Sequence, residues 1–202
     1  MVRKIAWVTM TVLAVLVGVY GGLAIFTPAI RPPLLQNLFD TVPIAVITHL
    51  AGGLIAIIVG AFQVNSRLRA RFLPAHRWLG RLYVGAVVVS ATAGFTLALG
   101  SHGGLVAHVG FGMMAVCWLF STSNAYRYIR AGDTVTHRQW MLRSYALTLA
   151  AVTLRLYLPA FQMAGYGFDT SYPLISWIAW VPNLLIVEWF ILTQRGRTAP
   201  TG

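Results

Sequence analysis

Six apolar stretches, each long enough to cross a lipid bilayer, constrain the fold of this chain more than any other feature. They lie near residues 5–26, 43–64, 76–99, 104–126, 137–163 and 173–193. A helix rises roughly 1.5 Å per residue and the hydrocarbon layer is about 30 Å thick, so about 20 apolar residues span it. Of the 202 residues, 58% are hydrophobic and 9% are charged, a balance that soluble domains of this size do not reach. We therefore expect an all-α integral membrane protein, with six transmembrane helices in a single domain over residues 1–202.

The first stretch could be mistaken for a secretory signal peptide, because Arg3 and Lys4 precede an apolar run. That run is too long for a signal peptide, and no small-residue cleavage site follows it. We interpret it as a retained transmembrane helix.

Basic residues in short loops predict the orientation of the helices. With a cytoplasmic N-terminus, Arg31 is the one basic residue in an outer loop. This outer segment, residues 27–42, contains three prolines and is expected to have irregular backbone. The basic residues at cytoplasmic helix ends are then Arg3, Lys4, Arg67, Arg69, Arg71, Arg77, Arg81, Arg127, Arg130, Arg138, Arg143, Arg195 and Arg197. We expect both termini in the cytoplasm and the second to fifth helices as a central four-helix bundle.

The formal net charge of +11 does not indicate a nucleic-acid-binding protein. The arginines are distributed over loops that topology alone makes basic, and they do not form one basic face. We expect them to meet anionic lipid headgroups, and we expect no nucleic-acid partner.

The histidines are placed more informatively than any other polar residues. In the predicted topology, His49 and His108 lie in the outer parts of the second and fourth helices. His76 and His137 lie in the first turns of the third and fifth helices, at the cytoplasmic side. The four residues therefore form two pairs, one at each membrane face.

Each of these histidines begins a helix face of small or polar residues. In three of the four faces, the residue one turn further along is glycine. Steps of four and three residues give the faces His49, Gly53, Ala56, Gly60, Gln63; His76, Gly80, Tyr83, Val87, Ser90, Gly94; His108, Gly112, Ala115, Leu119, Thr122; and His137, Met141, Ser144, Thr148, Ala151, Arg155.

Two interpretations compete for these faces. Small residues let helix backbones approach closely in lipid, and a histidine among them can donate a hydrogen bond across the interface. Alternatively, the small residues make room for a flat macrocycle, and each histidine supplies an axial ligand to haem iron. Helix packing explains any single face, but it explains less well four faces that are paired by depth. The pairing favours two haems, one held by His49 and His108 and one by His76 and His137.

Arginines beside the cytoplasmic histidines fit the same hypothesis. Arg77, Arg81 and Arg138 could pair with the propionates of an inner haem, because an unpaired carboxylate at a membrane boundary is costly. The alternative is structural: His76 and His137 are first-turn residues near Pro74 and an Asp133 or Thr134 cap, and the arginines follow the positive-inside rule.

Arg155 is harder to explain by topology. It lies 18 residues after His137, roughly 27 Å along the same helix face, and so near the outer histidine pair. An arginine at this depth needs an anion or a polar cavity. An outer haem propionate or a substrate anion would serve. Glu188 lies too near the cytoplasm and is expected to pair with Arg143 or another inner arginine.

Three stretches carry a resemblance to a known family. "HLAGGLIAIIVGAFQ", "HRWLGRLYV" and "HRQWMLRSYALTLAAVTLR" resemble the uncharacterised bacterial membrane proteins of the domain-of-unknown-function 2306 family, over most of the second to fifth helices. This resemblance implies a multi-pass protein of the bacterial plasma (inner) membrane and no particular activity.

The histidine arrangement is also similar to the cytochrome b561 family, six-helix proteins in which four histidines on the second to fifth helices hold two b-type haems. The "HRWLG" stretch is similar to that family's third helix. No counterpart of its ascorbate-binding basic motif is present, and the spacing is tighter, so the electron donor and acceptor are not carried over.

These observations together predict a transmembrane oxidoreductase that transfers electrons between two haems b. A quinone or quinol is the expected partner, because a chain without a soluble domain meets lipid-soluble carriers first. Membrane lipid is a further partner, and a homo-oligomer is compatible with the sequence. Two alternatives are a small-solute or proton-coupled transporter and a cofactor-free accessory or assembly subunit.

Overall fold

A computed structural model describes the backbone of residues 2–196 and the side chains of residues 4–194. In this part of the chain there are helices and turns but no strands. The side chains of Arg3 and Arg195 and all of Arg197, which the topology prediction used, lie outside the described residues. Six helical stretches are long and apolar enough to cross a membrane, which confirms the predicted spans. They are Lys4–Phe26, Pro43–Gln63, Leu73–Leu99, Gly104–Arg130, Thr134–Met163 and Phe168–Gln194.

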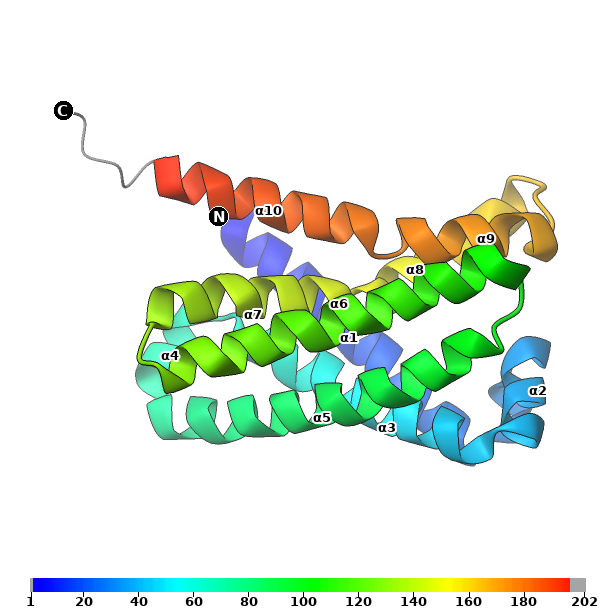
Figure 1. Cartoon of the computed structure of the whole chain (residues 1–202), viewed down its shortest axis with the longest axis horizontal. Helices are drawn as coiled ribbons and strands as arrows, with labels where there is room; N and C mark the ends of the chain where they lie inside the picture. Colours follow the sequence, from blue (N-terminus) through cyan, green and yellow to red (C-terminus); the bar gives the residue numbers. More distant parts are fainter. Residues whose placement is uncertain (1, 197–202) are drawn as a thin grey trace.

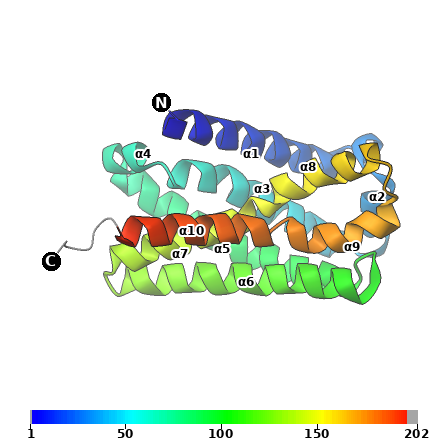
Figure 2. The same cartoon turned by 90° about the horizontal axis from the view of Figure 1, so that it is seen from above.

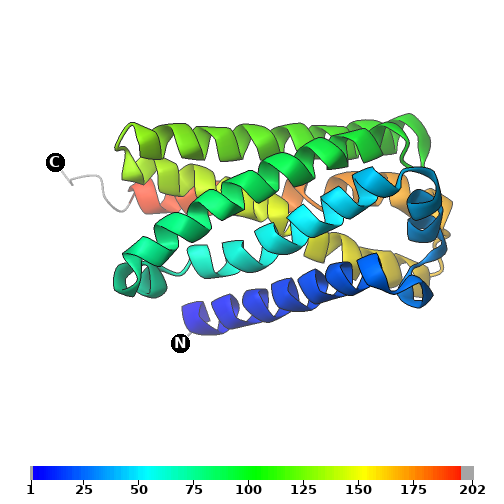
Figure 3. The same ribbon diagram turned by 90° about the horizontal axis from the view of Figure 1, so that it is seen from below.

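The central bundle consists of the second to fifth spans. Helix α3 packs against α5, α5 against α6, α6 against α7, and α7 against α3 (Figure 1). Helix α1 lies outside this bundle against α3 and α8, while α9 and α10 cover α6 and α7 (Figures 2 and 3). The elements are α1 (Val2–Phe26), η1 (Pro28–Ile30), α2 (Pro33–Thr41), α3 (Pro43–Gln63), α4 (Ser66–Arg71), α5 (Leu73–Leu99), α6 (Gly104–Arg130), α7 (Thr134–Thr148), α8 (Ala150–Met163), α9 (Phe168–Ile178) and α10 (Val181–Gly196).

Two spans are each built from two helices. In the fifth span, α7 ends at Thr148, whose hydroxyl donates to the Ser144 carbonyl at 3.0 Å. Such bonds to the preceding turn bend helices. In the sixth span, Pro182 follows the break between α9 and α10 and has no N–H to continue the hydrogen-bond ladder. The fifth span consequently changes partners: α7 packs on α6 and α10, and α8 packs on α1 and α9.

The segment from residue 27 to residue 42 is not irregular, and our prediction for it was wrong. It contains a short 3-10 turn and the helix α2, which begins at Pro33. Proline is favoured at the first helical position, where its missing N–H has no helical partner to lose and its φ is already helical. Arg31 supports this segment: its guanidinium donates to the Ala24 and Ile25 carbonyls at 2.7 and 2.9 Å and lies 3.6 Å from the centre of the Phe39 ring.

The two ends of the bundle differ in the elements that cover them. We name them the α2 end, where α2 and the turns at residues 100–103 and 164–167 lie, and the α4 end, where α4 and the turn at residues 131–133 lie. The first residues of α1 and the last residues of α10 are at the α4 end (Figures 1 and 2). Both termini of the described chain are therefore on the same side of the bundle.

Candidate functional site

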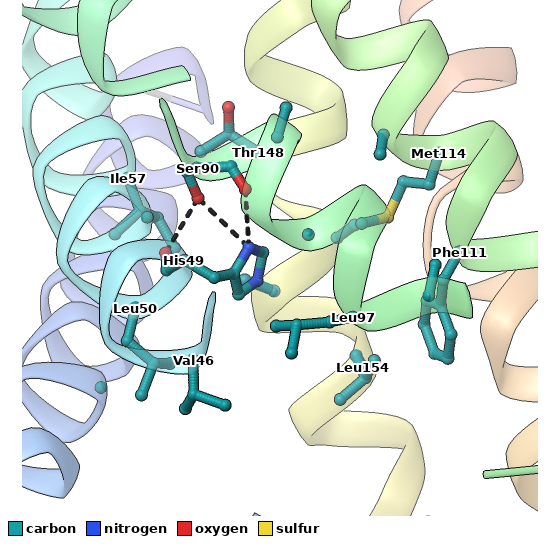
Figure 4. A pocket seen from close by; sticks show the side chains of 18 of the residues that line it. Val46, His49, Leu50, Ile57, Ser90, Leu97, Phe111, Met114, Thr148 and Leu154 are labelled. Atoms are coloured by element: carbon teal, nitrogen blue, oxygen red, sulfur yellow. Dashed lines mark hydrogen bonds between the residues drawn. The ribbon is translucent and has the colours of Figure 1, made fainter. Parts of the chain in front are cut away.

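A cavity of about 290 Å³ occupies the α2 half of the bundle. Residues of α1, α2, α3, α5, α6, α7, α8 and α9 line it, and most of them are apolar. Figure 4 shows His49 projecting into it, with Leu97, Phe111, Met114 and Leu154 on the side toward which the ring projects. Ligand sites are typically apolar hollows of this kind, from about 300 Å³ upwards, with a few polar groups that fix the ligand's orientation. Its polar lining residues are His49, Ser90, Ser101, His102, Thr148, Arg155 and Tyr172.

His49 is held in one orientation by α5. Its Nδ1 lies 2.9 Å from the Ser90 carbonyl, and the Ser90 hydroxyl donates to the His49 carbonyl at 2.8 Å. A carbonyl oxygen only accepts, so Nδ1 carries the proton and Nε2 keeps its lone pair. Gly94 makes this possible, because a Cβ there would lie 2.9 Å from Nδ1.

Arg155 lines the same cavity from α8, as His49 does from α3. The structure thus brings Arg155 to the outer histidine of the second span. His49 and Arg155 are the two lining side chains best suited to bind a ligand. His49 offers a nitrogen lone pair, and Arg155 offers a fixed positive charge.

His108, the predicted partner of His49, is placed differently. Its Nε2 donates to the Ser101 carbonyl at 2.8 Å, and it is not among the residues that line the cavity. His102 does line the cavity, although its ring is half exposed and its Nε2 lies 2.6 Å from an Asp169 carboxylate oxygen. The geometry therefore brings His49 to the cavity without bringing His108 to it.

At the α4 end, His76 lies in the early turns of α5 and His137 in the first turn of α7. His137 donates its Nδ1–H to the Ala125 carbonyl at 2.8 Å, which leaves Nε2 with its lone pair, as in His49. Both residues also occupy the early helical turns that the structural alternative required. Pro74 lies in the first turn of α5, and the Asp133 carboxylate caps α7 by accepting from the Thr136 N–H at 2.9 Å.

The arginines at this end divide into exposed and paired residues. Arg77, Arg81 and Arg138 are exposed, and Arg81 lies 4.9 Å from the Trp78 ring centre. Arg143 instead binds Glu188 through two nitrogens, one of them 2.8 Å from Oε2. This ion pair between α7 and α10 confirms the predicted partner of Glu188.

A cluster of buried hydroxyl groups lies between the cavity and the inner histidines. We call Tyr83, Thr122, Ser144 and Thr148 the hydroxyl cluster. The Tyr83 hydroxyl is 2.8 Å from Ser144 Oγ and 2.9 Å from Thr148 Oγ1, and Thr122 Oγ1 is 2.7 Å from Ser144 Oγ. Trp118 adds an N–H donated to Thr148 at 3.1 Å. The helix faces that begin at His76, His108 and His137 contain these residues, but helix periodicity did not predict that they meet.

The small residues of the histidine faces serve two purposes. A Cβ at Gly60 would meet the rings of Tyr83 and Tyr145, so this glycine of the His49 face serves close packing. Gly52, next to the same face, also serves close packing, because a Cβ there would lie 2.8 Å from Ser90 Cβ. Gly53 and Gly94 line the cavity. The packing interpretation therefore describes the middle of the bundle, and the pocket interpretation describes the α2 end.

Two of the four predicted histidines have the arrangement of a metal ligand. Metal-bound histidines commonly donate one ring N–H to a backbone carbonyl and bind with the other nitrogen, which is how His49 and His137 are arranged. His108 would have to give up its bond to Ser101 to bind through Nε2. His49 and His137 could hold iron, and Arg155 could meet a propionate.

Comparisons with known proteins identify one family. The family model described as "Predicted membrane protein (DUF2306)" matches residues 46–191, from α3 into α10. No curated protein and no solved structure matches the chain.

Proposed function

Because the chain belongs to the DUF2306 family of predicted membrane proteins and presents a histidine Nε2 at each end of its bundle, we propose that it is a transmembrane electron carrier with two haems b. The observation that supports this most directly is the shared arrangement of His49 and His137. Each donates its Nδ1–H to a backbone carbonyl of a neighbouring helix and keeps Nε2 for a ligand. When bound, haem supplies one-electron redox chemistry.

In this proposal the protein side chains hold and orient the two groups. His49 and His108 would hold the haem at the α2 end, His108 only after releasing the Ser101 carbonyl, and His76 and His137 would hold the haem at the α4 end. Arg77, Arg81 and Arg138 would neutralise propionates at the α4 end, and Arg155 would do so at the α2 end. The surrounding apolar side chains exclude water and raise the strength of these charge interactions.

The expected redox partner is a lipid-soluble quinone or quinol. The cavity reaches α1 and α2, outside the central bundle, and its walls there include Val17, Leu34 and Leu38. Such walls favour an apolar molecule arriving from the bilayer over a hydrated one. We propose that the protein acts as an oxidoreductase in the bacterial plasma membrane.

A small-solute or proton-coupled transporter is the second candidate. It is favoured by the polar groups of His49 and Arg155 inside a membrane-spanning bundle, since ionisable residues there often mark substrate pathways. A cofactor-free accessory subunit is favoured instead by the direct helix packing at Gly52 and Gly60. Neither alternative predicts a coloured protein.

The deciding experiment is an absorption spectrum of the purified full-length chain, oxidised and dithionite-reduced, with a pyridine haemochrome assay. The proposal predicts about two low-spin haems per chain. A colourless preparation from haem-replete cells would contradict it and leave the transporter and accessory-subunit proposals.

A further inference from the structure

Arg155 has only uncharged partners among the described residues. Its Nη1 donates to the Ala151 carbonyl of its own helix at 2.9 Å, and its Cζ lies 5.5 Å from the Tyr20 ring centre. A guanidinium has five N–H donors, so most of its hydrogen-bonding capacity is unused. Arg155 is also within the fifth membrane span, where an unpaired charge is expensive.

The chain has no carboxylate side chain left to pair with Arg155. It contains four Asp and Glu residues in total, and none of them lines the cavity. Each interacts with another residue: Asp40 with Gln36 at 2.8 Å, Asp133 with the Thr136 N–H at 2.9 Å, Asp169 with His102 at 2.6 Å, and Glu188 with Arg143. The negative partner of Arg155 must therefore come from outside these side chains.

Arg143 shows what the chain does where it supplies the anion itself. Arg143 and Arg155 lie in the same span, and Arg143 makes two bonds to the Glu188 carboxylate. The equivalent space around Arg155 is a cavity with apolar walls. An occupant that satisfies both features has one acidic group and an apolar body.

We propose that Arg155 binds the carboxylate of an amphipathic acid whose apolar body fills the cavity. Two sources share this chemistry: a propionate of the outer haem and a free lipid-soluble carboxylic acid. The site does not depend on the haem proposal, because the charge on Arg155 needs an anion with or without haem.

The test uses dibrominated stearic acid, whose bromine atoms quench tryptophan fluorescence, added to the purified full-length protein. Trp118 lines the cavity, so the relevant signal is the part of the quenching that Trp118→Phe removes. Arg155→Gln should weaken binding of the acid by about tenfold or more, because a charge-assisted hydrogen bond is lost. The matched control is Arg31→Gln, since Arg31 already donates to two backbone carbonyls, and it should leave binding unchanged.

A ligand comparison keeps the test valid if Arg155→Gln does not fold. The methyl ester of the same acid has no charge and should bind the wild-type protein at least about tenfold more weakly than the acid. Arg155→Lys, which keeps the charge, should retain most of the acid's affinity. Two results overturn the proposal in a protein whose site the acid enters. One is equal affinity of the wild-type protein for the acid and for its methyl ester. The other is equal affinity of the wild-type protein and a folded Arg155→Gln variant for the acid.

The haem content of the purified protein distinguishes the two sources of the carboxylate, a haem propionate and a free acid. In a haem-loaded protein that excludes the acid, Arg155→Gln should lower the outer midpoint potential while Arg31→Gln leaves it unchanged, because loss of a nearby positive charge stabilises the oxidised haem. An unchanged potential in that protein overturns the proposal. A colourless protein that binds the acid through Arg155 supports it and refutes the haem proposal.

Discussion

The α2 end and the middle of the bundle use small residues for opposite purposes. At the α2 end, Gly53 and Gly94 line a cavity into which His49 projects. In the middle, Gly60 faces the rings of Tyr83 and Tyr145, which fill the space that the glycine leaves. Both glycines Gly53 and Gly60 belong to one helix face of α3. The residue opposite a glycine therefore decides whether that glycine lines a pocket or allows two helices to pack closely.

The largest expected difference between the two ends is in cofactor loss. His49→Ala should remove the haem at the α2 end and keep most of the other, while His137→Ala should do the reverse. Under the proposed function, each variant would lose a nitrogen ligand from one iron only. The measurement is pyridine haemochrome content with separate redox titration of the remaining haem.

His108→Ala tests the predicted axial pairing at the α2 end. Under that pairing it should lose the same haem as His49→Ala. If the haem stays low-spin in His108→Ala, the second ligand is another residue. Met114 is then the candidate, because it lines the cavity, and Met114→Leu tests it. Loss of both haems, or of neither, in either single-histidine variant would argue against two independent sites.

The next effect is on stability and compares two glycines of one helix face. Gly60→Ala places a methyl group against the Tyr83 and Tyr145 rings, so it should destabilise the protein by about 1–3 kcal/mol. Gly53→Ala should change stability little, because the nearest side-chain atom is Ser90 Oγ at 3.6 Å. Thermal unfolding in detergent measures both. Equal destabilisation would mean that the cavity is not open at Gly53.

A smaller effect is expected within the hydroxyl cluster. Tyr83→Phe removes a hydroxyl that contacts both Ser144 and Thr148, and should cost about 1–2 kcal/mol. Tyr145→Phe removes one bond, donated to the Ile57 carbonyl at 3.1 Å, and should cost less. Unfolding of the two variants under identical conditions compares them. If Tyr145→Phe costs more, the cluster is not the main polar contact in the middle of the bundle.

The smallest effect concerns the cap of α7 and depends on pH. Bonds from the side chain and N–H of Thr136 lower the pKa of Asp133 below its ordinary value. The stabilisation is therefore fully present above about pH 4 and is lost as the pH falls through the lowered pKa. Asp133→Asn keeps a capping oxygen but should lose this pH dependence. Unfolding temperatures measured between pH 3 and pH 6 test it, and identical curves for the two proteins would contradict it.

Local sequence rules predicted the parts of the molecule that depend on short stretches of chain. Long apolar runs predicted all six spans, and the cap at Asp133 and the early-turn Pro74 followed from residue type. The break at Leu149 follows Thr148, whose hydroxyl bonds the Ser144 carbonyl, but Thr122 makes the same kind of bond inside the unbroken helix α6. Residue type alone therefore did not predict the break. Helix α2 lay in a segment where three prolines suggested disruption, although Pro33 instead begins a helix.

The candidate site was predictable only in part, because it depends on contacts between distant segments. Helical spacing related Arg155 to the outer histidines, and the depth of Glu188 near the cytoplasmic helix ends related it to Arg143 or another inner arginine. The same spacing could not tell which way a ring turns: His108 bonds Ser101, seven residues earlier, while His49 bonds Ser90 on another helix. The hydroxyl cluster joins residues up to 65 positions apart, so helix periodicity alone could not identify it.

Arg31 should count for less than the other basic residues when the positive charges of the inner and outer loops are compared. It is the single lysine or arginine that the predicted topology assigns to an outer loop, and its guanidinium bonds the carbonyls of Ala24 and Ile25. These carbonyls belong to the last turn of α1, where the helix dipole places a partial negative charge. The cation therefore completes the end of a membrane-spanning helix. In the predicted topology, Arg31 would cross the bilayer during insertion together with a helix terminus that neutralises part of its charge. It would therefore oppose the orientation favoured by the other basic residues less than a free loop arginine would.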